Sequence, residues 1–179
     1  MSKPVYEVIA GGLGSGKSSH ALNTFYGDQP VILGAGNRWF ELINLRFGSI
    51  KKHRDEVEQL GLICKQTWLW TIVSDIENIT APVLIIDEWT SFRIYTLLWS
   101  NKKIRERIQE IFRAIDENPN LIKVVFVCST CVPYLPFSLY KKIALWNKTL
   151  FQKADKVTRL DFGIPSVIKQ TPECVGGGD

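Results

Sequence analysis

Apolar residues along the chain gather in short continuous runs separated by longer stretches of mixed pattern. The runs predict strands at 5–10, 30–37, 83–88, 123–128 and 156–161. At 83–86 and 124–127 the apolar residues are uninterrupted, which is typical of strands buried on both faces of a parallel sheet. We therefore expect the last two acids of the third run, Asp87 and Glu88, to stand at the carboxyl end of a central strand.

Between these runs, apolar residues recur at helical spacing. They predict helices over 18–25, 39–60 with a break near Gly48, 101–117 and 138–153. Residues 63–79 have mixed spacing and receive no defined element. Alternating strands and helices predict an α/β fold with a mostly parallel central sheet flanked by helices. We expect a single domain over 1–169 and a disordered tail over 170–179, where three glycines adjoin.

Between the first strand and the first helix lies the motif GxxxxGKS, a phosphate-binding loop. Glycines let backbone N–H groups turn inward around a β-phosphate, Lys17 reaches the β- and γ-oxygens, and Ser18 ligates Mg²⁺ at the helix N-terminus. The motif predicts a P-loop NTPase-like fold that binds Mg²⁺ with ATP or GTP. Its residues are Gly11, Gly12, Leu13, Gly14, Ser15, Gly16, Lys17 and Ser18.

The two acids after the third run add chemistry to this loop. A strand adjacent to the loop would deliver the Asp87 carboxylate beside Ser18, as a second group organising the magnesium ion. Glu88 suits a carboxylate that polarises the attacking water of an ATPase. It equally suits a strand-end or helix-capping acid, because adjacent strand residues point to opposite faces. Both interpretations of Glu88 stay open.

Other polar positions are candidates for the nucleotide crevice. The second strand ends at Gly34, Ala35 and Gly36, and ligands bind outside the carboxyl ends of such strands. His53 stands in a polar, basic segment, where an imidazole is either a nucleophile towards an α-phosphate or a solvated helical residue. His20, inside the first helix, is assigned to packing or to the helix surface.

Composition narrows the class of protein. The chain has 179 residues, a net charge of +4 and four cysteines, and it lacks a run of 18 apolar residues or a signal-like N-terminus. We expect a cytoplasmic protein with free thiols and no membrane contact. The Cys128 and Cys131 pair is interpreted as incidental rather than metal-binding, since no second paired spacing exists.

Basic and aromatic residues give weaker signals. The lysines and arginines of 102–107 alternate with apolar residues at helical spacing, which favours a solvated helix face over a binding patch. Tryptophans are commonly core residues, although they also stack on a base or another flat ligand. Those considered are Trp68, Trp70, Trp89 and Trp99.

In order and spacing, these features resemble the bifunctional adenosylcobinamide kinase/adenosylcobinamide-phosphate guanylyltransferases. The likeness spans residues 5–169 and implies a histidine nucleophile that is guanylylated, here His53, with the basic Arg54 beside it. It implies transfer of phosphoryl and guanylyl groups from NTP to a corrinoid or other small-molecule acceptor, and a homo-oligomer. Its matching segments are the glycine loop, Gly34-Ala35-Gly36, His53-Arg54, Asp87 with Thr90, Asn147, Ala154-Asp155-Lys156-Val157 and Gly163-Ile164-Pro165.

Two other function classes remain alongside the transferase. The family carries a carboxylate after the fourth strand, where this chain has Cys128-Ser129-Thr130-Cys131-Val132. The chain is therefore also interpreted as a P-loop ATPase, a motor, switch or assembly factor that works with a protein or nucleic-acid partner. A nucleotide-binding interaction module without turnover is the third class.

Overall fold

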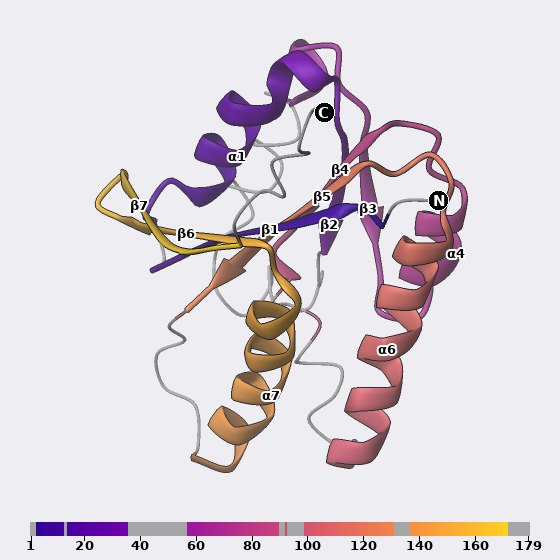
Figure 1. Cartoon of the computed structure of the whole chain (residues 1–179), viewed down its shortest axis with the longest axis vertical. Coiled ribbons are helices and arrows are strands. Elements are labelled where there is room, and N and C mark those ends of the chain that lie inside the picture. The colour runs from indigo at the N-terminus through magenta and orange to yellow at the C-terminus, as the bar shows by residue number, and fades with distance from the viewer. Residues whose placement is uncertain are drawn as a thin grey trace, which may run out of the picture.

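A computed structural model of the chain describes residues 3–12, 14–35, 57–89, 92, 99–130 and 137–171. The fold is α/β, with a seven-stranded sheet in the order β3-β2-β4-β5-β1-β6-β7 (Figure 1). Neighbouring strands are parallel except β6 and β7, which form an antiparallel pair. The strands are β1 (Val5–Gly11), β2 (Val31–Ala35), β3 (Cys64–Thr67), β4 (Val83–Asp87), β5 (Lys123–Ser129), β6 (Lys156–Asp161) and β7 (Ile164–Gln170).

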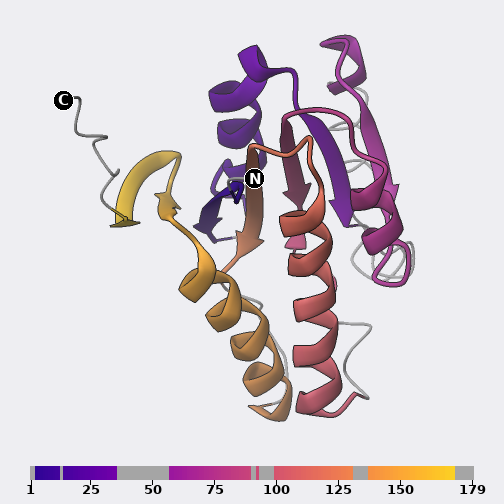
Figure 2. The ribbon, with the colours of Figure 1, turned by 45° about the vertical axis from the view of Figure 1, so that its right-hand side comes forward.

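Helices cover both faces of this sheet. Helix α1 lies on one face, and α4, α6 and α7 lie on the other, as Figures 1 and 2 show. The prediction of a mostly parallel sheet flanked by helices is confirmed. The helices are α1 (Lys17–Phe25), the short 3-10 helix η1 (Tyr26–Asp28), α4 (Ile72–Glu77), α6 (Asn101–Glu117) and α7 (Phe137–Lys153).

Both edges of the sheet differ from the sequence predictions. Residues 63–79, assigned no element, contain β3 and α4. Strand β3 is short and mostly polar, so it has little strand signal of its own, and its pairing with β2 defines it. At the other edge, the sequence predicts a turn over 163–165 and a disordered tail over 170–179, of which residues 172–179 lie outside the described residues. Instead, β7 runs to Gln170, and the Thr171 N–H donates to the Asp155 carbonyl.

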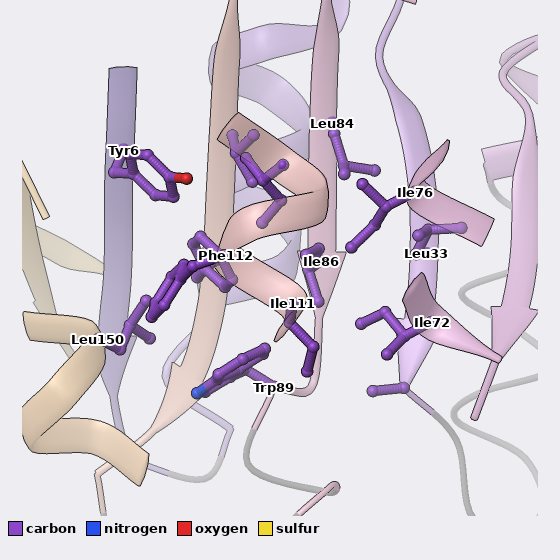
Figure 3. Close-up of a cluster of buried hydrophobic side chains, with 14 of the residues drawn as sticks. Tyr6, Leu33, Ile72, Ile76, Leu84, Ile86, Trp89, Ile111, Phe112 and Leu150 are labelled. Carbon is purple, nitrogen blue, oxygen red and sulfur yellow. The ribbon is translucent and has the colours of Figure 1, made fainter. Parts of the chain in front are cut away.

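The core is divided by the sheet into two hydrophobic clusters. Alternate residues of each central strand enter opposite clusters, because successive side chains of a strand point to opposite faces. In β4, Leu84 and Ile86 face α4, α6 and α7, while Ile85 faces α1. Figure 3 shows the larger cluster, in which labelled side chains of β1, β2 and β4 lie among those of α4, α6 and α7. Burial on both faces explains the continuous apolar runs.

Helix α6 follows the central strand β4 in the chain and leads to its neighbour β5. Ser100 caps its start by accepting a hydrogen bond from the Lys103 N–H at 3.2 Å. Beyond its end, the buried Asn118 amide donates to the carbonyls of Ile76 and Ile79 at 2.7 and 3.0 Å. Its predicted basic face is confirmed, since Lys102, Lys103 and Arg105 are exposed, although Arg107 is half-buried and donates to the Leu69 carbonyl. Within the described ranges, no helix has the length and apolarity needed to span a membrane.

Candidate functional site

The glycine loop joins the carboxyl end of β1 to α1, as the sequence predicts. Gly14 and Gly16 have φ values of 72° and 83°, in the left-handed region that favours glycine. Gly16 is the N-cap of α1, so the loop passes directly into the first helical turn. The Ser15 N–H donates to the Gly12 carbonyl at 3.3 Å and tightens the loop. Leu13 lies outside the described residues.

Gly11 is required by a close approach rather than by its φ value. A Cβ atom built at Gly11 would lie 2.5 Å from the Leu160 carbonyl oxygen and 2.6 Å from Ser15 Oγ. From the other side, the Thr130 N–H donates to the Gly11 carbonyl at 3.0 Å. The start of the loop is therefore held between the ends of β5 and β6. Neither Thr130 nor Leu160 carries a sequence signal for this role, because both act through backbone groups.

Lys17 lies inside the loop rather than on the surface. It is buried, and its Nζ donates to the Gly12 carbonyl at 2.7 Å. Ser15 Oγ is also buried and has no hydrogen-bond partner among the described residues. An ammonium has three N–H donors, and a hydroxyl can donate one hydrogen bond. Together with the N-terminus of α1, these groups form a cradle that suits an anion.

The predicted pairing of Ser18 with Asp87 is present. Ser18 Oγ donates to Asp87 Oδ1 at 3.0 Å, and Asp87 is buried at the last position of β4. Strand β4 is not the neighbour of β1, since β5 lies between them, yet the Asp87 side chain still reaches α1. Hydroxyl and carboxylate oxygens are ligands that Mg²⁺ accepts, and Mg²⁺ keeps several waters besides one or two protein ligands. The pair therefore fits a magnesium ion.

Glu88 adopts a conformation that the sequence does not reveal. Strand β4 ends at Asp87, and Glu88 has a φ of 58°, in the left-handed region. Its N–H donates to Asp87 Oδ1 at 2.9 Å, which adds a second bond to that carboxylate oxygen. The rule that adjacent strand residues face opposite ways applies to extended backbone only. It therefore gives no reason to exclude Glu88 from the site.

The next residue anchors this turn in the core. Trp89 is fully buried and makes T-shaped contacts with Phe92, Phe126 and Trp146, whose ring centroids lie 5.7, 5.0 and 5.0 Å away. Of the two roles considered for Trp89, the core role is confirmed. Trp70 differs, being 64% exposed and stacked on Trp68. The turn that carries Glu88 is thus fixed by packing against β5 and α7.

The remaining predicted site residues lie at the end of β2, in α1 or outside the described residues. Gly34 pairs with Asp87 in the β2–β4 register, so the end of β2 lies beside the acids. Ala35 is buried in the larger hydrophobic cluster, which is a packing position. His20 is half-buried in α1. Gly36, His53, Arg54, Thr90 and Cys131 lie outside the described residues.

A larger set of metal-ligating side chains was also sought in the described ranges. Those ranges contain no cluster of three or more histidine, cysteine, aspartate or glutamate side chains able to hold a metal ion. Cys128 is a buried residue of the larger hydrophobic cluster. Comparison with family models and with curated proteins finds no match for the chain. Function is therefore inferred from the residues of the site itself.

Proposed function

We propose that the chain is a P-loop nucleoside triphosphatase that binds Mg²⁺ with ATP or GTP and cleaves the bond between the β- and γ-phosphates. The observation that carries this proposal is the 3.0 Å hydrogen bond between Ser18 Oγ and Asp87 Oδ1. It brings a hydroxyl and a carboxylate from distant parts of the chain to the end of a lysine-containing glycine loop. That combination is suited to a metal-bound polyphosphate and has no evident use in packing.

Phosphate binding falls to the loop and to Lys17. Backbone N–H groups at the start of α1 point towards an anion, and the helix dipole favours negative charge there. The Lys17 ammonium, now on the Gly12 carbonyl at 2.7 Å, would turn one or more of its N–H groups to the β- and γ-oxygens. Ser18 and Asp87 would hold Mg²⁺, which when bound would supply positive charge against the negative charge of the triphosphate.

Glu88 is assigned the general base. Its carboxylate would accept a proton from water as the water oxygen bonds to the γ-phosphorus and the bond from that phosphorus to the β-phosphate oxygen breaks. The products are a nucleoside diphosphate and inorganic phosphate, and the proton passes from Glu88 to the phosphate or to solvent. The buried Trp89 keeps the Glu88 turn fixed, so the base is pre-organised. A protein or nucleic-acid partner would set the rate in a motor, switch or assembly factor.

A second candidate is the transferase that the family resemblance implies. The observation that favours it is the ordered likeness over residues 5–169, including His53 followed by Arg54. In that case the acceptor is a corrinoid or another small molecule. His53 would form a bond to the α-phosphorus as pyrophosphate leaves, giving a phosphoramidate that carries the nucleotide.

The test measures phosphate release from Mg²⁺–ATP and Mg²⁺–GTP by the wild type and three variants. We expect Glu88→Gln to lower kcat by about 10²–10⁴-fold while nucleotide affinity stays unchanged. Asp87→Asn should raise the Mg²⁺ concentration needed for half-maximal rate. The matched control is Glu117→Gln, an exposed acid at the end of α6, which should leave both quantities unchanged.

A further variant, His53→Ala, distinguishes the two candidates. Labelled α-³²P-NTP that leaves acid-labile label on the wild type but not on His53→Ala would favour the nucleotidyltransferase. Phosphate release without label on the chain would favour the triphosphatase. Nucleotide binding with neither product would assign the chain to the non-hydrolysing class, and absence of binding would refute the proposal.

A further inference from the structure

The turn of the hairpin formed by β6 and β7 lies at the carboxyl end of β6, directly beside the glycine loop. Leu160 pairs with Gly11 in the β1–β6 register, and β6 ends one residue later at Asp161. A strand rises by about 3.3 Å per residue, so Phe162 stands roughly 7 Å beyond the level of Gly11. Figures 1 and 2 both show the turn between β6 and β7 near the start of α1.

Phe162 occupies the tip of this hairpin in a backbone conformation that is unfavourable for a phenylalanine. The paired residues Asp161 and Ile164 leave a two-residue turn, in which Phe162 and Gly163 have φ values of 52° and 84°. Two positive φ values define the type I′ turn, which favours Asn-Gly rather than a bulky first residue. The Phe162 side chain is also 99% exposed. Neither the turn nor the core therefore accounts for a phenylalanine at this position.

Under the proposed function, the polarity of the site would direct the nucleoside towards this side of the loop. Asp87 and Glu88 stand at the end of β4, so the γ-phosphate and the attacking water belong on that side. The sheet order from there is β4, β5, β1 and β6. A triphosphate lying along the loop with its γ-phosphate towards β4 directs its ribose and base towards β6. The exposed ring of Phe162 lies in that direction.

We propose that Phe162 stacks on the purine base of the bound nucleotide. This inference rests on the proposed function, since it takes the phosphate site as given. Aromatic rings stack on every base and bind it with little sequence preference. A ring held on a closed two-residue turn loses little conformational freedom on binding. The ion pair between Arg159 and Asp161, at 2.9 Å, orders Asp161, which directly precedes the turn.

Calorimetry of the full chain with three Mg²⁺-loaded probes, ATP, GTP and inorganic tripolyphosphate, tests the inference. Stacking predicts that Phe162→Asn weakens ATP and GTP binding by about tenfold or more and leaves tripolyphosphate binding unchanged. Because asparagine suits the first position of a type I′ turn, this variant should fold at least as stably as the wild type. Phe162→Trp should retain nucleotide affinity. The matched control is Ile168→Ala, another exposed apolar residue of the hairpin, which should change none of the three affinities.

Each other outcome overturns the inference in an identifiable way. A wild type that binds tripolyphosphate as tightly as ATP keeps the phosphate site but leaves the base without a role. Equal weakening of the binding of all three probes in Phe162→Asn would mean that the ring affects the glycine loop and does not contact the base. Unchanged affinities with altered self-association by light scattering would make Phe162 a protein contact. A wild type that binds no probe refutes the proposed function itself, and with it the inference.

Discussion

Replacing Gly11 by alanine tests the packing on which the glycine loop depends. The added Cβ would lie 2.5 Å from the Leu160 carbonyl oxygen, a backbone atom that cannot rotate away. Ordinary van der Waals contact begins near 3.4 Å, so the β1 and β6 ends must separate by about 1 Å. Insertions of this kind into a packed site cost about 1–3 kcal/mol. We take about 2 kcal/mol for Gly11→Ala.

The neighbouring residue provides the matched control. A Cβ at Gly12 would meet nothing within 4 Å, and Gly12 is not among the residues with positive φ. Replacing such a glycine by alanine restricts the unfolded chain and stabilises the fold by about 0.4–1 kcal/mol. The two variants differ by one position in sequence, but the structure predicts opposite signs for their effects on stability.

Thermal unfolding followed by circular dichroism measures this difference. For a chain of this size, 1 kcal/mol shifts Tm by about 2–4 °C. Gly11→Ala should therefore lower Tm by about 6 °C, while Gly12→Ala should raise it by about 2 °C. Hydrogen exchange should locate the Gly11→Ala effect at the last pairs between β1 and β6. A Gly11→Ala protein as stable as Gly12→Ala would refute the close approach of Leu160 to the loop.

Three further predictions concern stability. Glu88→Gly should be more stable than Glu88→Ala by about 1 kcal/mol in urea unfolding, because Glu88 has a φ of 58°, which glycine adopts at less cost. Equal stabilities of the two variants would contradict a left-handed turn. Asn118→Ala should cost about 2–3 kcal/mol, since its amide caps two buried carbonyls, and a loss below 0.5 kcal/mol would count against those bonds. Burial opposes ionisation of Asp116, but hydrogen bonds from Lys153 and Tyr6 outweigh burial and lower the pKa of Asp116. The ionised Asp116 therefore stabilises the fold above the unfolded pKa of about 3.9, and this contribution is lost as pH falls through the lower pKa of the folded state. Asp116→Asn should therefore be less stable than the wild type at pH 7, by about 1–2 kcal/mol, with a gap that closes below about pH 4, and a pH-independent gap would refute this assignment.

The central strands and the helices around them were predictable because their signals are local. Continuous apolar runs identified β1, β4 and β5, and helical spacing identified α6 with the bounds that the structure shows. The edge strands were not predictable. The β3 sequence CKQT has no alternation to recognise, and β7 is exposed along its length, so both depend on pairing with a neighbour.

The candidate site followed the same division. The glycine loop is a local motif, so its position and the roles expected of Lys17 and Ser18 could be stated from the sequence. The sequence predicts that Asp87 lies beside Ser18. It does not predict that β5 separates the strand of Asp87 from β1, because strand order is set by long-range packing. The close approach of Leu160 to Gly11 and the left-handed turn at Glu88 leave no trace in residue type.

The sequence by itself thus determined the glycine loop and the buried strands, because backbone conformation in a short glycine motif and burial of an apolar run depend on few neighbours. Only the tertiary structure decided the placement of β5 between β1 and β4, the turn at Glu88 and the exposure of Phe162 beside the loop. These features arise from many weak contacts between residues far apart in the chain, whose sum selects one strand order and fixes which side chains meet.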